Sequence, residues 1–226
     1  MTLSLLTDLA PADLAALAGL LVAWFGCGWL IERSDRSVTQ LMSRYRRDWM
    51  VEMITRQPRI FDATILGSLR QGTTFLASGA MIAVGGVLAL AGNAERLDSI
   101  VMDVGAVGQP VLLWQAKLTL VALILVHAVF KFVWSNRLFG YCAVVMASVP
   151  NDVDHPEARP RADQAAELNI RAALNFNRGL RSIYFAFAAL AWVAGPWALM
   201  FGTAAICWTV LSREFASTSR IVLMED

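Results

Sequence analysis

The chain has 226 residues, of which 57% are hydrophobic and 16% are charged, and its formal net charge is +1. This balance is too apolar for an ordinary soluble domain and is typical of an integral membrane protein. The near-neutral charge gives no reason to expect nucleic acid as a partner. The three cysteines are widely spaced in apolar stretches, which predicts packing residues and neither a disulfide framework nor a zinc site.

The first apolar stretch, residues 14–31, is long enough to cross a bilayer and predicts the first membrane span. Gly19, Ala23 and Cys27 recur every four residues, so their small side chains share one face where another helix can approach closely. The residues before this span include no lysine or arginine. Because a cleaved signal peptide begins with a basic segment, we expect the span to stay attached.

The segment 32–72 holds eight of the 17 arginines in the chain. Its residues 32–56 predict an amphipathic helix that continues the first span into the cytoplasm and ends at Gln57-Pro58. The apolar stripe of this helix consists of Val38, Leu41, Met42, Tyr45, Trp49 and Met53. Two interpretations stay open: the basic segment 33–59 lies on anionic lipid headgroups, or it packs on another cytoplasmic helix.

Two further spans are predicted, at residues 73–92 and 111–134. The second of them holds the two lysines of the chain, Lys117 and Lys131, separated by 13 uncharged residues. Both lysines are close enough to the ends of the span to extend to the headgroups, which is the simpler interpretation. The alternative is that Lys131 and His127, four residues apart on one helical face, point into a protein-lined cavity.

The segment 135–181 predicts more cytoplasmic helix, interrupted by an exposed loop at 151–160 and ended near Gly179. A fourth span is predicted at 183–211. Pro196 lacks the N–H that would bond the Trp192 carbonyl, so Gly195-Pro196 predicts a kink in this span. The simpler interpretation is that helix packing accommodates the proline, and the alternative is that the freed carbonyl lines a cavity. In the alternative topology, the chain turns back at Gly195-Pro196.

The two long connections, 32–72 and 135–181, together hold 14 of the 17 arginines. The positive-inside rule therefore places both connections in the cytoplasm and the N-terminus outside, as in a multi-pass protein of the bacterial inner membrane. Four single crossings place the C-terminus outside. A last segment that turns back places it inside, together with Arg213 and Arg220.

The segment NFNRGLRSIYFAFAALAWVAGPWALM near the end of the chain carries a family resemblance. The matching residues are Asn177, Gly179, Arg181, Tyr184, Trp192, Gly195 and Pro196. On this pattern, and on the small-residue span at 68–92, the chain resembles the DUF599 family of bacterial and plant membrane proteins. The resemblance implies a four-span, all-α membrane fold and offers no catalytic residue.

The sequence shows no cluster of nucleophile, base or metal ligands, so we expect no enzyme activity and no cofactor. A single intramembrane histidine, His127, is not enough for a bis-histidine haem site. One hypothesis is a homo-oligomeric pore or transporter for a small anion or neutral solute. Its predicted pathway is lined by His127, Lys131, Asn175, Asn177, Arg178, Arg181, Trp192, Gly195 and Pro196. The alternative is a non-catalytic scaffold or accessory subunit that docks onto another membrane complex.

Overall fold

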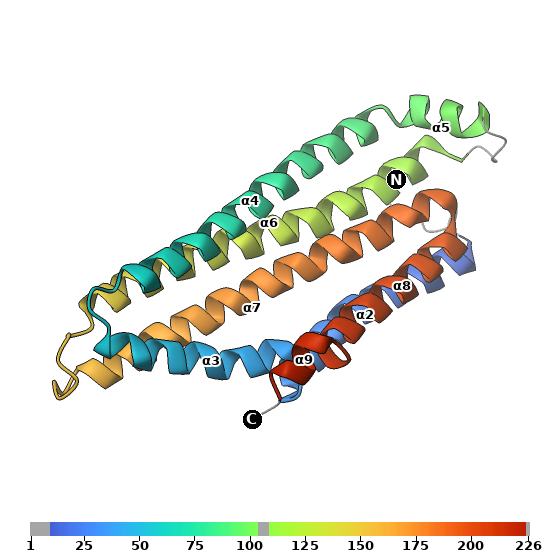
Figure 1. Cartoon of the computed structure of the whole chain (residues 1–226). Coiled ribbons are helices and arrows are strands. Elements are labelled where there is room, and N and C mark those ends of the chain that lie inside the picture. The colour runs from blue at the N-terminus through green and yellow to red at the C-terminus, as the bar shows by residue number, and fades with distance from the viewer. Residues whose placement is uncertain (1–9, 104–108, 225–226) are drawn as a thin grey trace. The chain divides into compact units, whose positions relative to one another are not determined.

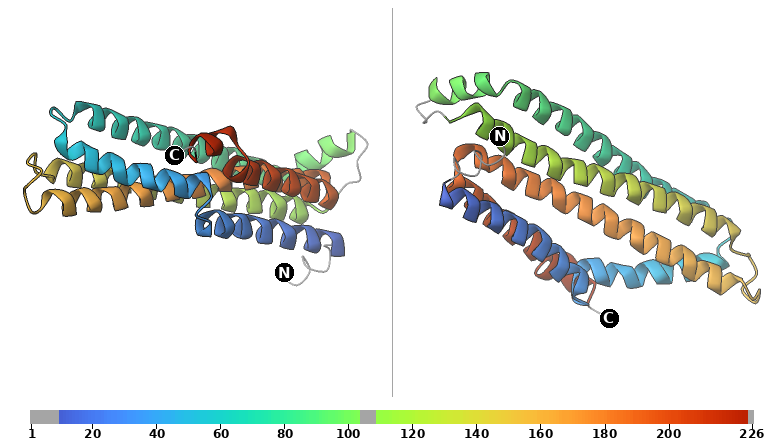
Figure 2. Two further views of the ribbon diagram at one scale, coloured as in Figure 1. Left: turned by 60° about the horizontal axis from the view of Figure 1, so that its bottom comes forward. Right: turned by 180° about the vertical axis from the view of Figure 1, so that it is seen from behind.

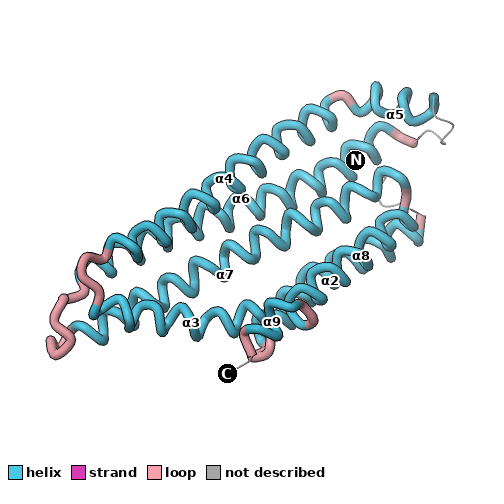
Figure 3. The backbone as a smooth tube through the Cα atoms, in the orientation of Figure 1, coloured by secondary structure: helices cyan, strands magenta, loops and turns pink. Residues whose placement is uncertain are grey.

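A computed structural model describes residues 10–103 and 109–224, and every regular element in these ranges is a helix (Figure 1, Figure 3). The elements are α2 (Pro11–Arg33), α3 (Val38–Glu52), η1 (Met53–Thr55), α4 (Ile60–Gly92), α5 (Ala94–Asp103), α6 (Val111–Ser148), α7 (Ala158–Leu190), η2 (Ala191–Ala194), α8 (Pro196–Phe215) and α9 (Thr218–Val222). The all-α prediction is confirmed for this part of the chain.

Three of the helices, α2, α4 and α6, are long and apolar enough to cross a membrane. They contain the first three predicted spans. Large apolar side chains are exposed on them, such as Phe75 and Ile82 of α4, which are 76% and 77% exposed. Because a water-soluble surface rarely carries so many such side chains together, this exposure is typical of a lipid-facing surface.

The chain divides into two compact units, and the helices α2, α4, α6, α7 and α8 each contribute residues to both. The first unit consists of Met1–Trp29, Gly79–Ala128 and Arg181–Val210. The second unit consists of Leu30–Ser78, Val129–Leu180 and Leu211–Asp226.

The prediction of one kinked helix over residues 183–211 is wrong. Helix α7 ends at Leu190, and the short helix η2 leads to Gly195, whose φ of 107° is accessible mainly to glycine. Helix α8 then starts at Pro196, where the missing N–H costs nothing, and runs back along α7 (Figure 2). A Cβ on Gly202 of α8 would lie 3.3 Å from that of Ala191, so the hairpin is closely packed.

The predicted continuation of the first span into the helix at 32–56 is also wrong. A break separates α2 from α3, and Ser37 provides the N-cap of α3 by accepting a hydrogen bond from the N–H of Gln40. The Ser37 hydroxyl also donates to the carbonyl of Ile31 at 2.8 Å, which satisfies one of the last carbonyls of α2. The serine therefore fixes the break from both sides.

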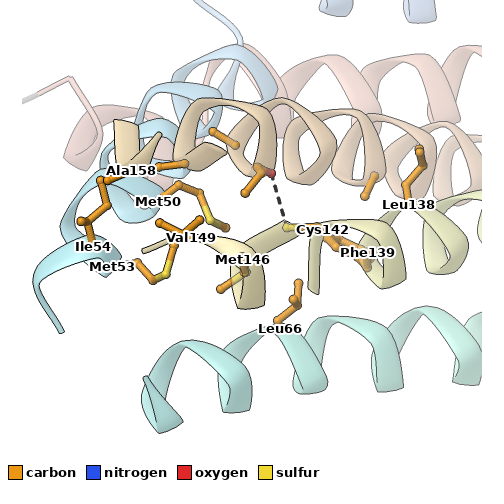
Figure 4. Close-up of a cluster of buried hydrophobic side chains, with 14 residues drawn as sticks. Met50, Met53, Ile54, Leu66, Leu138, Phe139, Cys142, Met146, Val149 and Ala158 are labelled. Atoms are coloured by element: carbon orange, nitrogen blue, oxygen red, sulfur yellow. Dashed lines mark hydrogen bonds between the residues drawn. The ribbon is translucent and has the colours of Figure 1, made fainter. Parts of the chain in front are cut away.

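Alanines allow α6 and α7 to pack closely in the second unit. Ala158, Ala162, Ala165 and Ala166 of α7 are fully buried, and Cys142 of α6 donates to the Ala165 carbonyl at 3.4 Å (Figure 4). The core cluster is completed by Met50, Met53, Ile54, Leu66, Leu138, Phe139, Met146, Val149 and Ala172. Leu138, Phe139, Cys142 and Met146 therefore lie on the buried face of α6.

The predicted apolar stripe of α3 is wrong in part. Met42 and Tyr45 are exposed, whereas the polar residues Thr39 and Ser43 are buried. The buried face of α3 is thus selected by hydrogen-bonding groups as well as by hydrophobicity, as the site geometry below explains.

The predicted helix end at Gly179 is wrong, because α7 continues to Leu190. A Cβ on Gly179 would lie 2.8 Å from Cε1 of Phe132 on α6, so only glycine leaves room for this ring. Gly140 provides a control, because a Cβ there would meet nothing within 4 Å.

We expect Gly179→Ala to lower the free energy of unfolding by about 1–3 kcal/mol through overpacking. Gly140→Ala is expected to have no destabilising effect, because alanine is the better helix former by about 1 kcal/mol. Thermal unfolding in detergent measures both changes. Adding Phe132→Leu to Gly179→Ala is expected to recover part of the loss. Equal effects of the two alanine substitutions would contradict the close contact.

Candidate functional site

Lys117 of α6 lies inside the first unit with 2% of its surface exposed. Its Nζ donates to Oε1 of Gln109 at 2.7 Å and lies 5.2 Å and 5.5 Å from the ring centroids of Trp114 and Trp192. The two indole faces attract the ammonium, which has lost most of its contact with solvent. For Lys117, the prediction of an outward-extended side chain is therefore wrong, because protein groups surround the charge.

Asp13, in the first turn of α2, supplies a carboxylate next to this lysine. It is 8% exposed and accepts a hydrogen bond at 2.7 Å from Nε1 of Trp192. Its charge acts on Lys117, so one indole contacts both an anion and a cation. We call Asp13, Gln109, Trp114, Lys117 and Trp192 the Lys117 site. Asp13 precedes the predicted span 14–31 and belongs to the first turn of α2, which begins at Pro11.

The turn between α7 and α8 positions Trp192 in this site. Trp192 belongs to η2, and its carbonyl accepts a hydrogen bond at 2.9 Å from the N–H of Gly195. The prediction of a carbonyl freed by Pro196 is therefore wrong. Gly195 and Pro196 form the turn, and Trp192 contributes its indole ring to the Lys117 site.

A second group of polar side chains lies farther along α6 in the first unit. Nδ1 of His127 is 2.9 Å from the Ser182 hydroxyl, and its ring packs edge-on against Trp24 at 5.1 Å. The neighbouring Arg181 is 6% exposed, and its Nη2 would lie 3.9 Å from a Cβ on Gly28 of α2. Lys131 is half-buried in the second unit. The hypothesis that Lys131 and His127 point together into a protein-lined cavity stays a prediction.

In the second unit, Glu214 at the end of α8 binds the start of α3. Its carboxylate accepts from the N–H of Thr39 at 3.0 Å and from the Thr39 hydroxyl at 2.8 Å. The Thr39 hydroxyl in turn accepts from Nδ2 of Asn177 at 3.2 Å. A carboxylate is favourable at this position because the first N–H groups of a helix lack intrahelical partners. These contacts explain why α3 buries Thr39.

Arg178 makes a two-pronged ion pair with Glu32 of α2. Nε lies 2.9 Å from Oε1 and Nη2 lies 2.5 Å from Oε2, and these bonds raise the pKa of Arg178. Asn175 instead donates to the carbonyl of Arg171 within its own helix. Of the residues predicted to line the pathway, Arg181 belongs to the first unit, whereas Asn175, Asn177 and Arg178 belong to the second.

Several partners in these sites were missed by the sequence reasoning, namely Asp13, Glu32, Thr39, Gln109, Trp114 and Glu214. Trp114 is three residues from Lys117 on α6, a spacing that places the two side chains on one helical face. The ion-pair and hydrogen-bond partners Asp13, Glu32, Thr39 and Glu214 lie far along the chain from the residues they contact, so no spacing rule relates them. Among the described residues, no group of three or more His, Cys, Asp or Glu side chains is placed to hold a metal ion.

We expect Lys117→Met to destabilise the protein by about 3 kcal/mol, because it leaves a buried carboxylate without its cation. Asp13→Asn should have a similar cost for the converse reason. The double substitution is expected to cost clearly less than the sum, and unfolding of the three variants in micelles measures this coupling. Additive losses would show that the two charges do not interact.

Asp98 of α5 joins this helix to the start of α6. Its Oδ1 accepts from the N–H of Gln109 at 2.9 Å and from Nε1 of Trp114 at 2.8 Å, and these bonds lower the pKa of the carboxyl. A lowered pKa in the folded state means that the contribution is complete above the unfolded value of about 3.9. It is lost as the pH falls through the folded value.

The difference in unfolding temperature between the wild type and Asp98→Asn is therefore expected to be constant above about pH 5 and to shrink below about pH 4. Thermal unfolding of both proteins across this range measures it. A difference that grows on acidification would have the wrong sign for this contact.

The sequence of this chain matches one known protein family. The family described as "Protein of unknown function, DUF599" matches residues 15–219, which include the Thr39 contacts and every member of the Lys117 site except Asp13. No curated protein and no solved structure matches the chain. Because the match covers most of the sequence, the chain belongs to the DUF599 family of proteins of unknown function.

Proposed function

We propose that this protein is a membrane transporter or pore for a small anion or neutral solute, with the polar groups of the first unit on its path. The observation that carries the proposal is the burial of Lys117 and Arg181 in one apolar unit. Ionisable side chains are costly within a bilayer, and those that persist there commonly mark ion or substrate pathways.

The polar groups extend along α6. Lys117 and His127 are ten residues apart, which corresponds to about 15 Å of helix, or about half of a hydrocarbon layer. Arg181 directly precedes Ser182, the partner of His127. Polar side chains at both levels provide successive sites for a solute that crosses the unit.

The charge balance favours an anion over a cation. Among the buried side chains of the described first unit, two are cationic, Lys117 and Arg181, and one is a carboxylate, Asp13. A fixed positive excess lowers the energy of an anion in a medium of low dielectric constant and raises that of a cation.

The α7–α8 hairpin supports a topology with five membrane segments, the N-terminus outside and the C-terminus inside. This arrangement places Arg213 and Arg220 on the inner side with the arginines of the two long connections, so all arginines except Arg96 and the buried Arg181 lie there. An excess of arginine on the cytoplasmic side is expected for a protein of the bacterial inner membrane. The exposed residues Arg44, Tyr45 and Arg47 of α3 suit contact with anionic headgroups.

Assembly of several copies is supported by α4, whose apolar residues are mostly exposed. A Cβ placed on Gly79, Gly85 or Gly86 would meet nothing within 4 Å, so these small residues are unused within the chain. Small residues allow close helix contact in membranes. The same face favours the second candidate function, docking onto another membrane complex, and a stoichiometric partner in the purified particle would identify that role.

Flux through proteoliposomes tests the proposal. The wild type is expected to raise permeability to small anions or solutes above that of empty vesicles, and Lys117→Met should lower anion flux at least about tenfold. Gln115→Met, which changes an exposed side chain two residues away, is the matched control. The double variant Asp13→Asn, Lys117→Met removes both charges of the pair, so no buried charge is left without its partner. Loss of flux in this folded double variant would therefore show an effect on transport and not on stability. Wild-type vesicles no more permeable than empty ones would contradict the proposal.

A further inference from the structure

A cavity of about 220 Å³ lies in the second unit next to the Thr39 contacts. Its walls are formed by α3, α7 and the end of α8, and two of the side chains that line it, Arg46 and Glu214, carry opposite charges. A water molecule occupies about 30 Å³ of liquid, so the volume corresponds to roughly seven waters. A metabolite of similar size fits, whereas a drug-sized ligand does not.

Arg46 has no carboxylate partner among the ion pairs of the described residues. Its Nη1 donates to Oδ1 of the fully buried Asn169, which fixes the position of the guanidinium. Burial lowers the pKa of Arg46, because the charge has lost solvent without gaining a counter-ion. A guanidinium has five N–H donors, so several remain to bind an anionic group.

Glu214 likewise makes no ion pair within the described part of the chain. Each of its oxygens accepts one hydrogen bond from Thr39, which leaves further acceptor positions on the carboxylate. The cavity therefore has one cation and one anion on its walls, and neither forms an ion pair with a described residue. A ligand with both charges satisfies both groups, whereas a ligand with a single charge leaves one of them unpaired.

The positions of the two charges restrict the ligand further. Thr39, which binds Glu214, and Arg46 are seven residues apart on α3, or about 10 Å of helix. The charges of the ligand must therefore be several ångströms apart. Met42, Ile170 and Leu174 also line the cavity and provide an apolar surface for a short aliphatic chain.

We infer that this cavity binds a small zwitterion whose carboxylate pairs with Arg46 and whose ammonium pairs with Glu214 across a short aliphatic chain. Linear ω-amino acids have this chemistry. The inference goes beyond the transport proposal and stands independently of it, because the cavity and the Lys117 site belong to different units.

Equilibrium binding of radiolabelled 4-aminobutyrate to the purified full chain in detergent tests the inference. We expect saturable binding to one site per chain. Unlabelled 5-aminopentanoate should compete well, whereas butyrate and butylamine, which each lack one charge, should compete at least about tenfold more weakly. Glycine should also compete weakly, because its two charges are too close together.

Arg46→Gln and Glu214→Gln are each expected to weaken binding at least about tenfold. Glu214→Gln keeps one side-chain oxygen that accepts a hydrogen bond from Thr39, so we expect this variant to fold. Arg47→Gln is the matched control, because Arg47 is the next residue on α3 and forms a surface ion pair with Glu167 at 3.5 Å. Its affinity should be unchanged.

If Arg46→Gln does not fold, Ala173→Leu tests the cavity in its place, because the larger leucine side chain fills the cavity without removing a charge. We expect it to abolish binding. No saturable binding to the wild type would overturn the inference. Equal competition by butyrate, or unchanged affinity in both Glu214→Gln and Ala173→Leu, would overturn it as well.

Discussion

The ammonium of Lys117 constrains how the helices of the first unit meet. A lipid interior provides no water to solvate a charge, so a buried lysine there requires protein partners. These come from the start of α2, the residue Gln109 before α6, α6 itself and the turn before α8. Because Asp13 and Trp192 are 179 residues apart in the chain, their hydrogen bond connects the start of α2 with the turn between α7 and α8.

The second unit is held together by two different kinds of contact. Alanines on α7 allow close approach to α6 and build an apolar core, which supplies most of the burial. Specific polar bonds then fix the ends of helices, as when Glu214 binds the first turn of α3 and Arg59 donates to the carbonyl of Val149 near the end of α6. These bonds determine which face of α3 is buried. They also leave the charges of Arg46 and Glu214 available at a cavity.

The sequence predicted the helices well where a local signal was present. Periodicity located the helical segments and Gln57-Pro58 ended one of them, because these signals act over a few residues. Gly195-Pro196 was ambiguous, since the same pair suits a kink or a reversal and the positive φ of Gly195 depends on tertiary packing. The Lys117 site was not predictable. Its members Asp13 and Trp192 are 104 and 75 residues from Lys117, and no periodicity relates them.

The central claim is that Lys117 is enclosed by protein groups, and the presence of two lysines in the chain allows a direct measurement. Acylation of the folded protein in detergent with a small amine-reactive reagent, followed by mass spectrometry, compares Lys117 with the half-buried Lys131. The account predicts that Lys131 reacts while Lys117 stays unmodified until the protein is unfolded. Modification of Lys117 in the folded protein as fast as that of Lys131 would contradict it.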